Sequence, residues 1–423
     1  MITSLRLRNF KTFAEEIEIS FTGSFSIKRF LCNTFETKGK RVLKTIGFYG
    51  PNNTGKTCLI LALANLRALM LNESHEDLCN SFIKNNVTYF KVEYIIKDRM
   101  YSYDVSYDNK EKKYIREELN KLTVAPSNSS MISSKTLIVK DKNGVIFGGS
   151  KNGSGNFGKE TLMKMFSPSL PILKSLEFAE DIFPDLYQAQ KDYIEFASSI
   201  ILVRNDKHFL DIRPTLELIK NDLKARKFIS EFIKNSDLHI SDFGFSDNIE
   251  TDVDVSNFVK PSTNLETLKF YSVHKGYKVP SFIFDSLGTQ KIIALSGYIY
   301  QAIKNGGILL IDEIDGSLHH ILTRAIISLF NNDLNKRAQL VFTTHDLLLL
   351  DLEKLFRKDQ IYLTNIHEKT GESVLVHLSD ITSKDEDGIR GDEDIRKHYL
   401  HGRFGKLPSP ELFDVLEETL DEQ

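Results

Sequence analysis

The sequence predicts an α/β fold: a mixed sheet with a parallel core, an antiparallel β subdomain and an inserted helical lobe. Two apolar runs, residues 306–313 and 338–346, end in polar residues and lead into helical patterns, which is typical of parallel strands buried on both faces. Apolar and polar residues alternate in several runs over residues 89–147, with turns between them, as in antiparallel hairpins. The stretch from about 186 to 234 has the apolar spacing of helices.

The elements of the amino-terminal part follow from changes in this periodicity. Residues 1–8 and 16–21 each alternate apolar with charged residues and predict two strands. Residues 43–50 predict a more continuously apolar strand, and residues 58–71 have the length and composition of a helix buried on most sides. The hairpins of residues 89–147 come next.

The remaining elements suggest an insertion in this fold. Residues 148–162 are a glycine-rich connector to the helical lobe, and a short alternating region at 265–279 leads back to the core. A terminal pair of strands is expected at 360–366 and 373–378. We therefore divide the chain into a first part of the core, the lobe and a second part of the core: residues 1–155, 156–265 and 266–423.

The composition is that of an ordinary soluble globular protein, with 41% hydrophobic and 27% charged residues. No apolar run is long enough to span a bilayer and no secretion signal is apparent, so we expect a cytoplasmic protein without a membrane partner. The three cysteines, Cys32, Cys58 and Cys79, lack metal-site spacing. A net charge of −3 means that binding of DNA would need a local basic patch, such as residues 38–44 or 221–228, which are otherwise solvated surface.

The stretch "GPNNTGKT" fits the phosphate-loop pattern G-x-x-x-x-G-K-[ST] in full. The glycines let backbone N–H groups point at phosphate oxygens, the lysine reaches the β and γ phosphates of ATP, and the last hydroxyl binds Mg²⁺. A glycine turn could match by chance, but the position between a strand and a buried helix favours a phosphate site. The expected nucleotide-binding residues here are Gly50, Pro51, Asn52, Asn53, Thr54, Gly55, Lys56, Thr57 and Cys58.

Two carboxylates end the apolar strand "ILLIDE". Asp312 would hold Mg²⁺ and Glu313 would polarise the attacking water, because phosphoryl transfer needs positioning and charge neutralisation. The alternative is that both acids only cap the following helix, whose apolar face is marked by Leu318, Leu322 and Ile326. An intact phosphate loop in the same chain favours the catalytic interpretation.

His345 ends the strand "VFTTH", where its imidazole could hydrogen-bond a γ-phosphate. The alternative is a structural histidine. Further upstream, Ser286 is a candidate N-cap of the helix that ends before "NGG" at 305–307. The pattern Ser286, Gly288, Thr289 at a helix start could bind an anion, or Ser286 could be a plain cap.

In their order these motifs resemble the heads of ABC-type ATPases: Walker A, signature helix, Walker B with a catalytic Glu, D-loop and switch histidine. The motifs lie at Gly50 to Thr57, Ser286 to Gln290, Asp312 and Glu313, Asp315 to His319, and His345. The resemblance implies that Lys56, Glu313 and His345 are catalytic and that Thr57 and Asp312 bind the metal. It also implies a homo-oligomer with composite ATP sites, in which Ser286, Gly288 and Thr289 of one copy meet the nucleotide of another. No glutamine loop can be assigned.

More narrowly, the chain is similar to soluble AAA/ABC-like ATPases of bacterial antiphage, abortive-infection systems, the RloA/AbiLi-like group, to which the ATPase of the PARIS system is similar. The stretches that carry this similarity are "LRLRNFKTF" (5–13), "DSLGTQK" (285–291), "DEIDGSLHHILT" (312–323), "FTTHDLLLLD" (342–351), "LFRKDQIYL" (355–363) and "YLHGRFGKLP" (399–408). The resemblance implies a dimer or larger oligomer that acts as sensor and regulator. Its partners would be a phage protein as trigger and a toxin or nuclease encoded nearby, for example of Toprim type.

The sequence leaves three other functions open. A DNA-repair ATPase of the RecF or Rad50 kind would bind duplex DNA, although the middle insertion is too short for long coiled-coil arms. A nuclease of the OLD type would use carboxylates such as those in residues 384–394, but too little chain follows His345 for a Toprim domain, and a solvated acidic loop explains the run. A transporter subunit is disfavoured by "SLGT" and the terminal extension.

Overall fold

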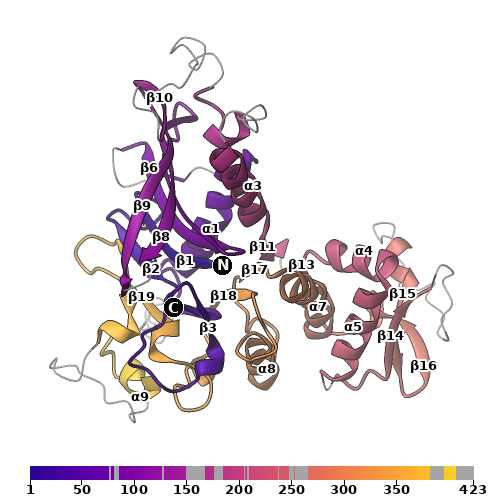
Figure 1. Ribbon diagram of the computed structural model, residues 1–423. Helices are drawn as coiled ribbons and strands as arrows, with labels where there is room; N and C mark the ends of the chain where they lie inside the picture. Colours follow the sequence, from indigo (N-terminus) through magenta and orange to yellow (C-terminus); the bar gives the residue numbers. More distant parts are fainter. Residues whose placement is uncertain are drawn as a thin grey trace, which may run out of the picture.

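The computed structural model shows a tall sheet-based body with a smaller lobe beside it (Figure 1). The expected acidic run at 384–394 and nearly all of the glycine-rich connector lie outside the described residues. Within the described ranges, no helix combines the length and the apolar character needed to cross a membrane. These ranges are residues 1–75, 78–80, 85–125, 128–148, 167–175, 184–203, 205–206, 209–236, 238–246, 252, 265–381 and 395–405.

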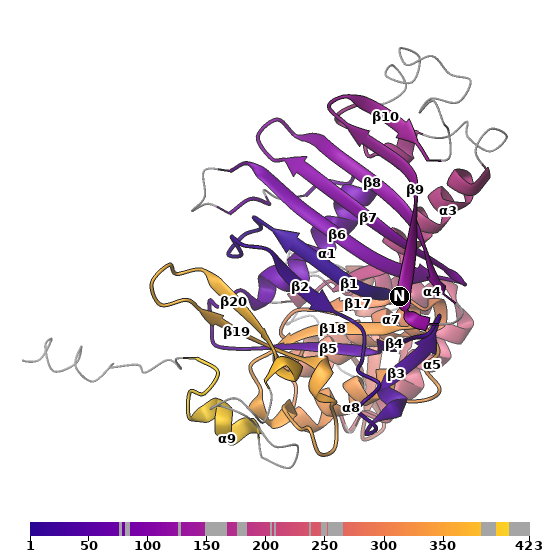
Figure 2. The ribbon, with the colours of Figure 1, turned by 60° about the vertical axis from the view of Figure 1, so that its left-hand side comes forward.

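A seven-stranded antiparallel sheet forms the upper part of the body, in the order β10-β9-β8-β7-β6-β1-β2 (Figure 2). The two amino-terminal strands and the hairpins predicted from alternation are confirmed. One strand, β8, was not expected, because its acidic and basic residues obscure the period of two. The strands are β1 (Ile2–Arg8), β2 (Ile17–Ser20), β6 (Val87–Ile96), β7 (Arg99–Asp108), β8 (Lys113–Ala125), β9 (Asn128–Asp141) and β10 (Gly144–Phe147).

A six-stranded sheet lies below it, in the order β11-β17-β18-β5-β19-β20, and every neighbouring pair except the last is parallel. The predicted parallel core is therefore confirmed. All residues of β5, β17 and β18 are buried, which explains their continuous apolar runs. The strands are β5 (Thr45–Tyr49), β11 (Ile200–Val203), β17 (Ile308–Ile311), β18 (Gln339–Thr344), β19 (Ile361–Ile366) and β20 (Ser373–His377).

Three helices pack on these sheets. The helix α1 (Lys56–Leu71) shares one hydrophobic core with the antiparallel sheet, and α8 (His320–Phe330) packs on β18. The helix α3 (Pro184–Ser198) falls in the range expected for the lobe but packs on α1, β6 and β9 instead. Its Phe196 ring stacks on Tyr94 with the centroids 4.0 Å apart, so aromatic burial explains this placement.

The lobe contains two helices and a three-stranded antiparallel sheet, to which the alternating residues 265–279 contribute rather than to the core. The expected helical stretch breaks in two at Asp222, whose carboxylate caps the second helix by accepting from the N–H groups of Lys224 and Ala225. The elements are α4 (Arg213–Asn221), α5 (Leu223–Lys234), β14 (Asp242–Phe245), β15 (Phe270–His274) and β16 (Tyr277–Pro280).

The helix α7 (Leu287–Asn305) joins the lobe to the body, because α4 and α5 pack on one side of it and β11 and β17 on another. The Thr215 hydroxyl in α4 donates to the Ala294 carbonyl at 2.7 Å, and a Cβ on Gly297 would collide with Thr215. This close approach fixes α7 to the lobe.

The smaller elements are β3 (Thr34–Thr37), β4 (Lys40–Leu43), β12 (Asn205–Asp206), β13 (Phe209–Leu210), α6 (Ser281–Phe284), α9 (Ile395–Leu400) and short 3-10 turns, η1 (Leu31–Asn33), η2 (Ile172–Ser175), η3 (Leu265–Lys269), η4 (Leu347–Leu349), η5 (Lys358–Gln360) and η6 (Leu378–Asp380).

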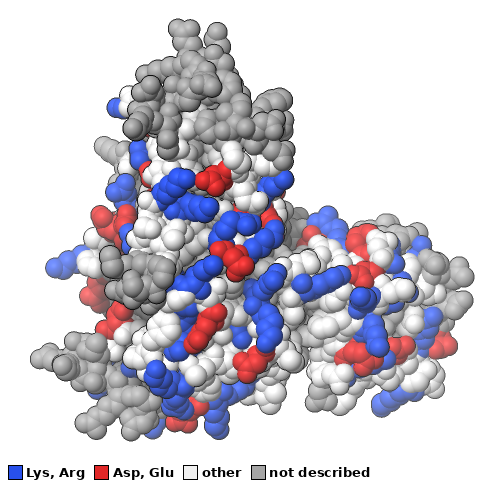
Figure 3. All heavy atoms as spheres, in the orientation of Figure 1, with Lys and Arg blue, Asp and Glu red and all other residues white. Residues whose placement is uncertain are grey.

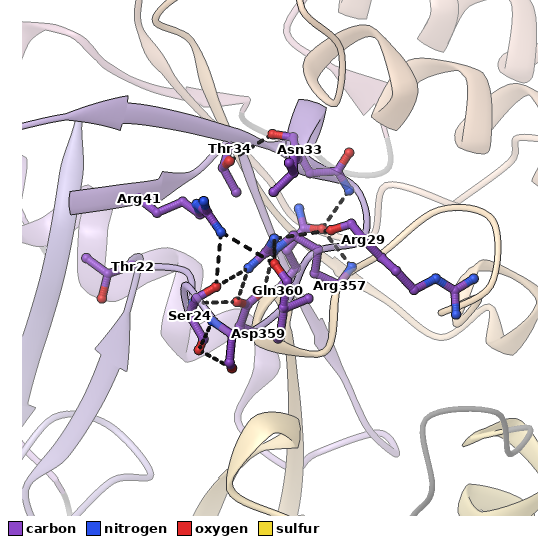
Figure 4. Close-up of polar contacts among 12 residues, drawn as sticks. Thr22, Ser24, Arg29, Asn33, Thr34, Arg41, Arg357, Asp359 and Gln360 are labelled. Carbon is purple, nitrogen blue, oxygen red and sulfur yellow. Dashed lines mark hydrogen bonds and ion pairs between the residues drawn. The ribbon is translucent and has the colours of Figure 1, made fainter. Parts of the chain in front are cut away.

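A buried ion pair next to the parallel sheet holds the loop of residues 24–29, which we call the amino-terminal loop (Figure 4). The Arg357 guanidinium is fully buried and donates to both carboxylate oxygens of Asp359, at 2.8 and 2.7 Å. It also donates to the carbonyls of Ser24, Ile27 and Arg29. Five hydrogen bonds on one guanidinium offset much of the cost of burying the charge.

Candidate functional site

The predicted phosphate loop, residues 50–57, connects β5 to α1. Gly55 has a φ of 96°, in the left-handed region that favours glycine. A Cβ on Gly50 would collide with Thr364 of the neighbouring strand β19, so this glycine is required by packing. The exposed Asn52 and Asn53 form the crown of the loop, whereas Thr54 is buried and bonded to the Pro51 carbonyl at 2.8 Å.

Lys56 lies across the inside of this loop. Its Nζ donates to the carbonyls of Gly50, at 2.9 Å, and Pro51, at 2.6 Å. Burial lowers the pKa of Lys56, and the carboxylates of Asp312 and Glu313 partly oppose this effect. The site therefore places a cation among backbone groups at the start of a helix, where phosphate oxygens are well stabilised.

The candidate metal ligands meet although they lie far apart in the sequence. The Thr57 hydroxyl donates to Asp312 Oδ1 at 3.2 Å, and the same oxygen accepts from Thr343 Oγ1 at 2.6 Å. In the part of the chain that the structure describes, no group of three or more His, Cys, Asp or Glu residues could hold a metal by itself. Thr57 and Asp312 fit Mg²⁺, which takes one or two protein oxygens plus water and substrate phosphates.

Glu313 occupies a strained turn beside these ligands. Its φ is 48°, its N–H donates to Thr343 Oγ1 at 2.7 Å, and its carboxylate side chain is 58% exposed. His345 Nε2 lies 4.0 Å from Glu313 Oε1, and the His345 N–H donates to Asp315 Oδ2 at 3.3 Å. The structure thus brings Glu313 and His345 together at the edge where Thr57 and Asp312 lie.

The predicted N-cap of the helix α7 is confirmed. Ser286 Oγ accepts from the Thr289 N–H at 3.2 Å, and Thr289 is buried while Ser286 and Leu287 are exposed. A Cβ on Gly288 would lie 2.6 Å from the Ser317 carbonyl. Among the described residues, no hydrogen bond joins Ser286 or Thr289 to residues 50–57, so the two halves of the expected nucleotide site are not joined within one chain.

Two parts of the site were not found from the sequence. The strand β11 pairs with β17, so its Val203 end reaches the same edge and lines a groove with Thr57 and Asp312. Lys291 in α7 donates to the Glu313 and Gly316 carbonyls, and burial lowers the pKa of Lys291 to about 8 despite the carboxylates nearby. A lysine five residues after Ser286 was the only sequence signal for this contact.

Thr343 was also missed, although it links the candidate metal ligand Asp312 to the candidate catalytic residue Glu313. We expect Thr343→Val to lower ATP hydrolysis by about tenfold, because the variant loses the hydrogen bonds to both Asp312 and the Glu313 N–H. A loss of about 1.4 kcal/mol in stabilisation of the transition state corresponds to this factor. Phosphate release at saturating ATP measures this effect. Thr343→Ser keeps the hydroxyl and serves as the control; equal activity of the two variants would contradict the role of Thr343.

Residues 175–351 match the protein family described as "AAA domain, putative AbiEii toxin, Type IV TA system". This range covers less than half of the 423 residues and includes Ser286, Asp312, Glu313 and His345, while the phosphate loop precedes it. The match and the site geometry support an ATPase of the AAA/ABC-like class. A search of the curated proteins found no match.

Heads of SMC proteins are among the solved structures to which this chain shows a distant similarity. The SMC head domain from Thermotoga maritima is 11% identical with a TM-score of 0.41, over 89% of this chain and 98% of that one. A second SMC head, from Pyrococcus furiosus, with an extended coiled coil and bound to the C-terminal domain of ScpA, is 11% identical with a TM-score of 0.43, over 90% of this chain and 97% of that one.

Proposed function

We propose that this chain is an ATP-hydrolysing regulator of a bacterial antiphage system, which assembles as a dimer or larger oligomer and controls a partner toxin or nuclease. The observation that carries the ATPase assignment is the meeting of Thr57, Asp312 and Glu313 beside the phosphate loop. The defence role is supported by the matched family, whose description names the AbiEii toxin, and by the resemblance of the motifs to ATPases of abortive-infection systems.

The site geometry supports a role for each of these residues. The loop N–H groups and Lys56 would bind the phosphates of the substrate ATP, and Thr57 and Asp312 would hold Mg²⁺, which neutralises phosphate charge when bound. Glu313 would orient the attacking water, since its carboxylate is exposed and its backbone is fixed. His345 would contact the γ-phosphate from the next strand end.

Oligomerisation is supported by the start of α7. Ser286 and Leu287 are exposed, and Ser286 bonds to Thr289 rather than to the phosphate loop of its own chain. Leu287 is 53% exposed and Phe284 is 40% exposed, an apolar pair at the helix start that a second copy would cover. We therefore propose that Ser286, Gly288 and Thr289 complete the nucleotide site of another subunit.

A DNA-repair ATPase is the alternative, and the surface gives it limited support. Lysines and arginines gather across the middle of the face drawn in Figure 3, with acidic residues between them. A groove that includes Met1 and the strand β3 is lined by four basic and four acidic residues, Lys44, Lys97, Lys336, Arg337, Glu36, Asp98, Glu195 and Asp333. Because these positive and negative charges balance, the groove does not have the uniformly positive potential that binding of duplex DNA requires.

Purification with the products of neighbouring genes tests the proposal. We expect a toxin or nuclease to co-purify, and the mass of the complex with ATP to differ from that of the Lys56→Ala variant, because assembly would depend on the nucleotide. ATP hydrolysis is measured on the same material with and without duplex DNA over a salt series. Strong stimulation by DNA without a co-purifying effector would favour the repair ATPase.

A further inference from the structure

The helix α7 reaches the catalytic turn through one lysine side chain. Lys291 Nζ donates to the carbonyl of Glu313 at 2.9 Å and to that of Gly316 at 2.7 Å. These two carbonyls bracket the turn that follows β17, and a third contact lies nearby, where Gly288 approaches the Ser317 carbonyl. The turn after the catalytic carboxylate is therefore held by the same helix that begins at Ser286.

The Glu313 backbone is held from both sides. Its N–H donates to Thr343 of the neighbouring strand and its C=O accepts from Lys291. A φ of 48° is unfavourable for a glutamate, so such a conformation persists only where the surroundings determine it. The two hydrogen bonds supply this constraint, and they fix the position of the Cα from which the Glu313 carboxylate extends.

The charge of Lys291 also suits this place. The carboxylates of Asp315, Glu313 and Asp312 favour the charged form of Lys291, whereas burial of the ammonium group favours the neutral form. Three acids close together repel one another, and a nearby cation lowers the cost of keeping them ionised. No other Lys of α7 can do this, because Lys304 pairs with Asp222 of the lobe at the opposite end of the helix.

We propose that Lys291 is a positioning residue for ATP hydrolysis, which holds the Glu313 turn in its strained conformation and couples it to the helix that carries Ser286. This inference rests on the proposed function of Glu313. Since α4 and α5 pack on α7 and Thr215 is bonded to it, a shift of the lobe would move Lys291 and the turn together. Closure of a second subunit on Ser286 would then act on Glu313 in the same chain.

The test removes the donors of Lys291 while keeping most of its volume. We expect Lys291→Met to lower kcat by about 10- to 100-fold, the cost of a displacement of about 1 Å in a catalytic group, with the Kd for ATP within about twofold of the wild type. Lys291→Gln keeps a donor amide and should lose less. Lys304→Met on the same helix is the matched control and should leave kcat unchanged.

A double-mutant cycle separates positioning from a general structural effect. If Lys291 acts through Glu313, Lys291→Met should cost little more in a Glu313→Gln background, measured by single-turnover hydrolysis. If the double variant loses rate by the product of the two single-variant factors, Lys291 does not act through Glu313 and the inference is overturned. A wild-type kcat for both Lys291 variants would overturn it as well. If Glu313→Gln alone keeps full hydrolysis, the proposed function fails instead, so the two failures are distinguishable.

Discussion

Glu313→Gln should lower the rate of ATP hydrolysis by about 100- to 1,000-fold while ATP still binds, since a positioned base contributes about that much to such a reaction. The amide keeps the size of the carboxylate but cannot polarise water in the same way. Lys56, Thr57 and Asp312, which would hold the phosphates and Mg²⁺, are unchanged. Phosphate release at saturating ATP and the Kd of a fluorescent ATP analogue measure the two effects separately.

The control for this variant is an exposed glutamate to which no role in the site is given. Glu368 lies in the turn between β19 and β20, and Glu368→Gln should hydrolyse ATP at the wild-type rate. We also expect Glu313→Gln to accumulate as an ATP-bound oligomer, because this variant binds ATP without hydrolysing it. Full hydrolysis by Glu313→Gln would contradict the assignment of Glu313.

Asp359→Ala should lower the free energy of unfolding by about 3–5 kcal/mol, the cost of leaving a buried charge without its partner. Arg357 is fully buried and loses both carboxylate bonds in this variant, and the Ser24 N–H loses its acceptor as well. Urea denaturation followed by circular dichroism measures the loss.

Two further variants define the cause of that loss. Replacing both members, Arg357→Met with Asp359→Leu, should recover part of the stability, because no unpaired charge then remains. Glu195→Gln removes the partner of the exposed Lys97 and should cost less than about 1 kcal/mol. A loss below that value for Asp359→Ala would show that the buried pair does not fasten the loop.

The strand ends were predictable because each one carries a local signal. Asp312, Glu313 and His345 follow apolar runs, and in a parallel sheet such residues meet at one edge, as β17 and β18 demonstrate. The glycines of the phosphate loop were equally predictable, because the backbone conformation of this loop requires glycine at set positions of the sequence.

The contacts that position these residues carry no local signal. Thr343 bonds to the Glu313 N–H from 30 residues away, and Lys291 reaches Glu313 across 22 residues. The sequence shows their types but not which backbone group each one meets. The same reason explains why the residues of α3 were expected in the lobe: the apolar face of the helix was apparent, whereas its packing on the antiparallel sheet was not.

The strand that precedes the phosphate loop has a consequence for synthesis of the chain. β5 lies between β18 and β19, and Thr45 is bonded to Gln360, which is 315 residues later. A ribosome releases β5 and the apolar helix α1 long before their parallel neighbours exist, and such unpaired segments are prone to aggregate until they are paired. The nascent chain therefore cannot complete the sheet that carries its nucleotide site until translation has passed β19.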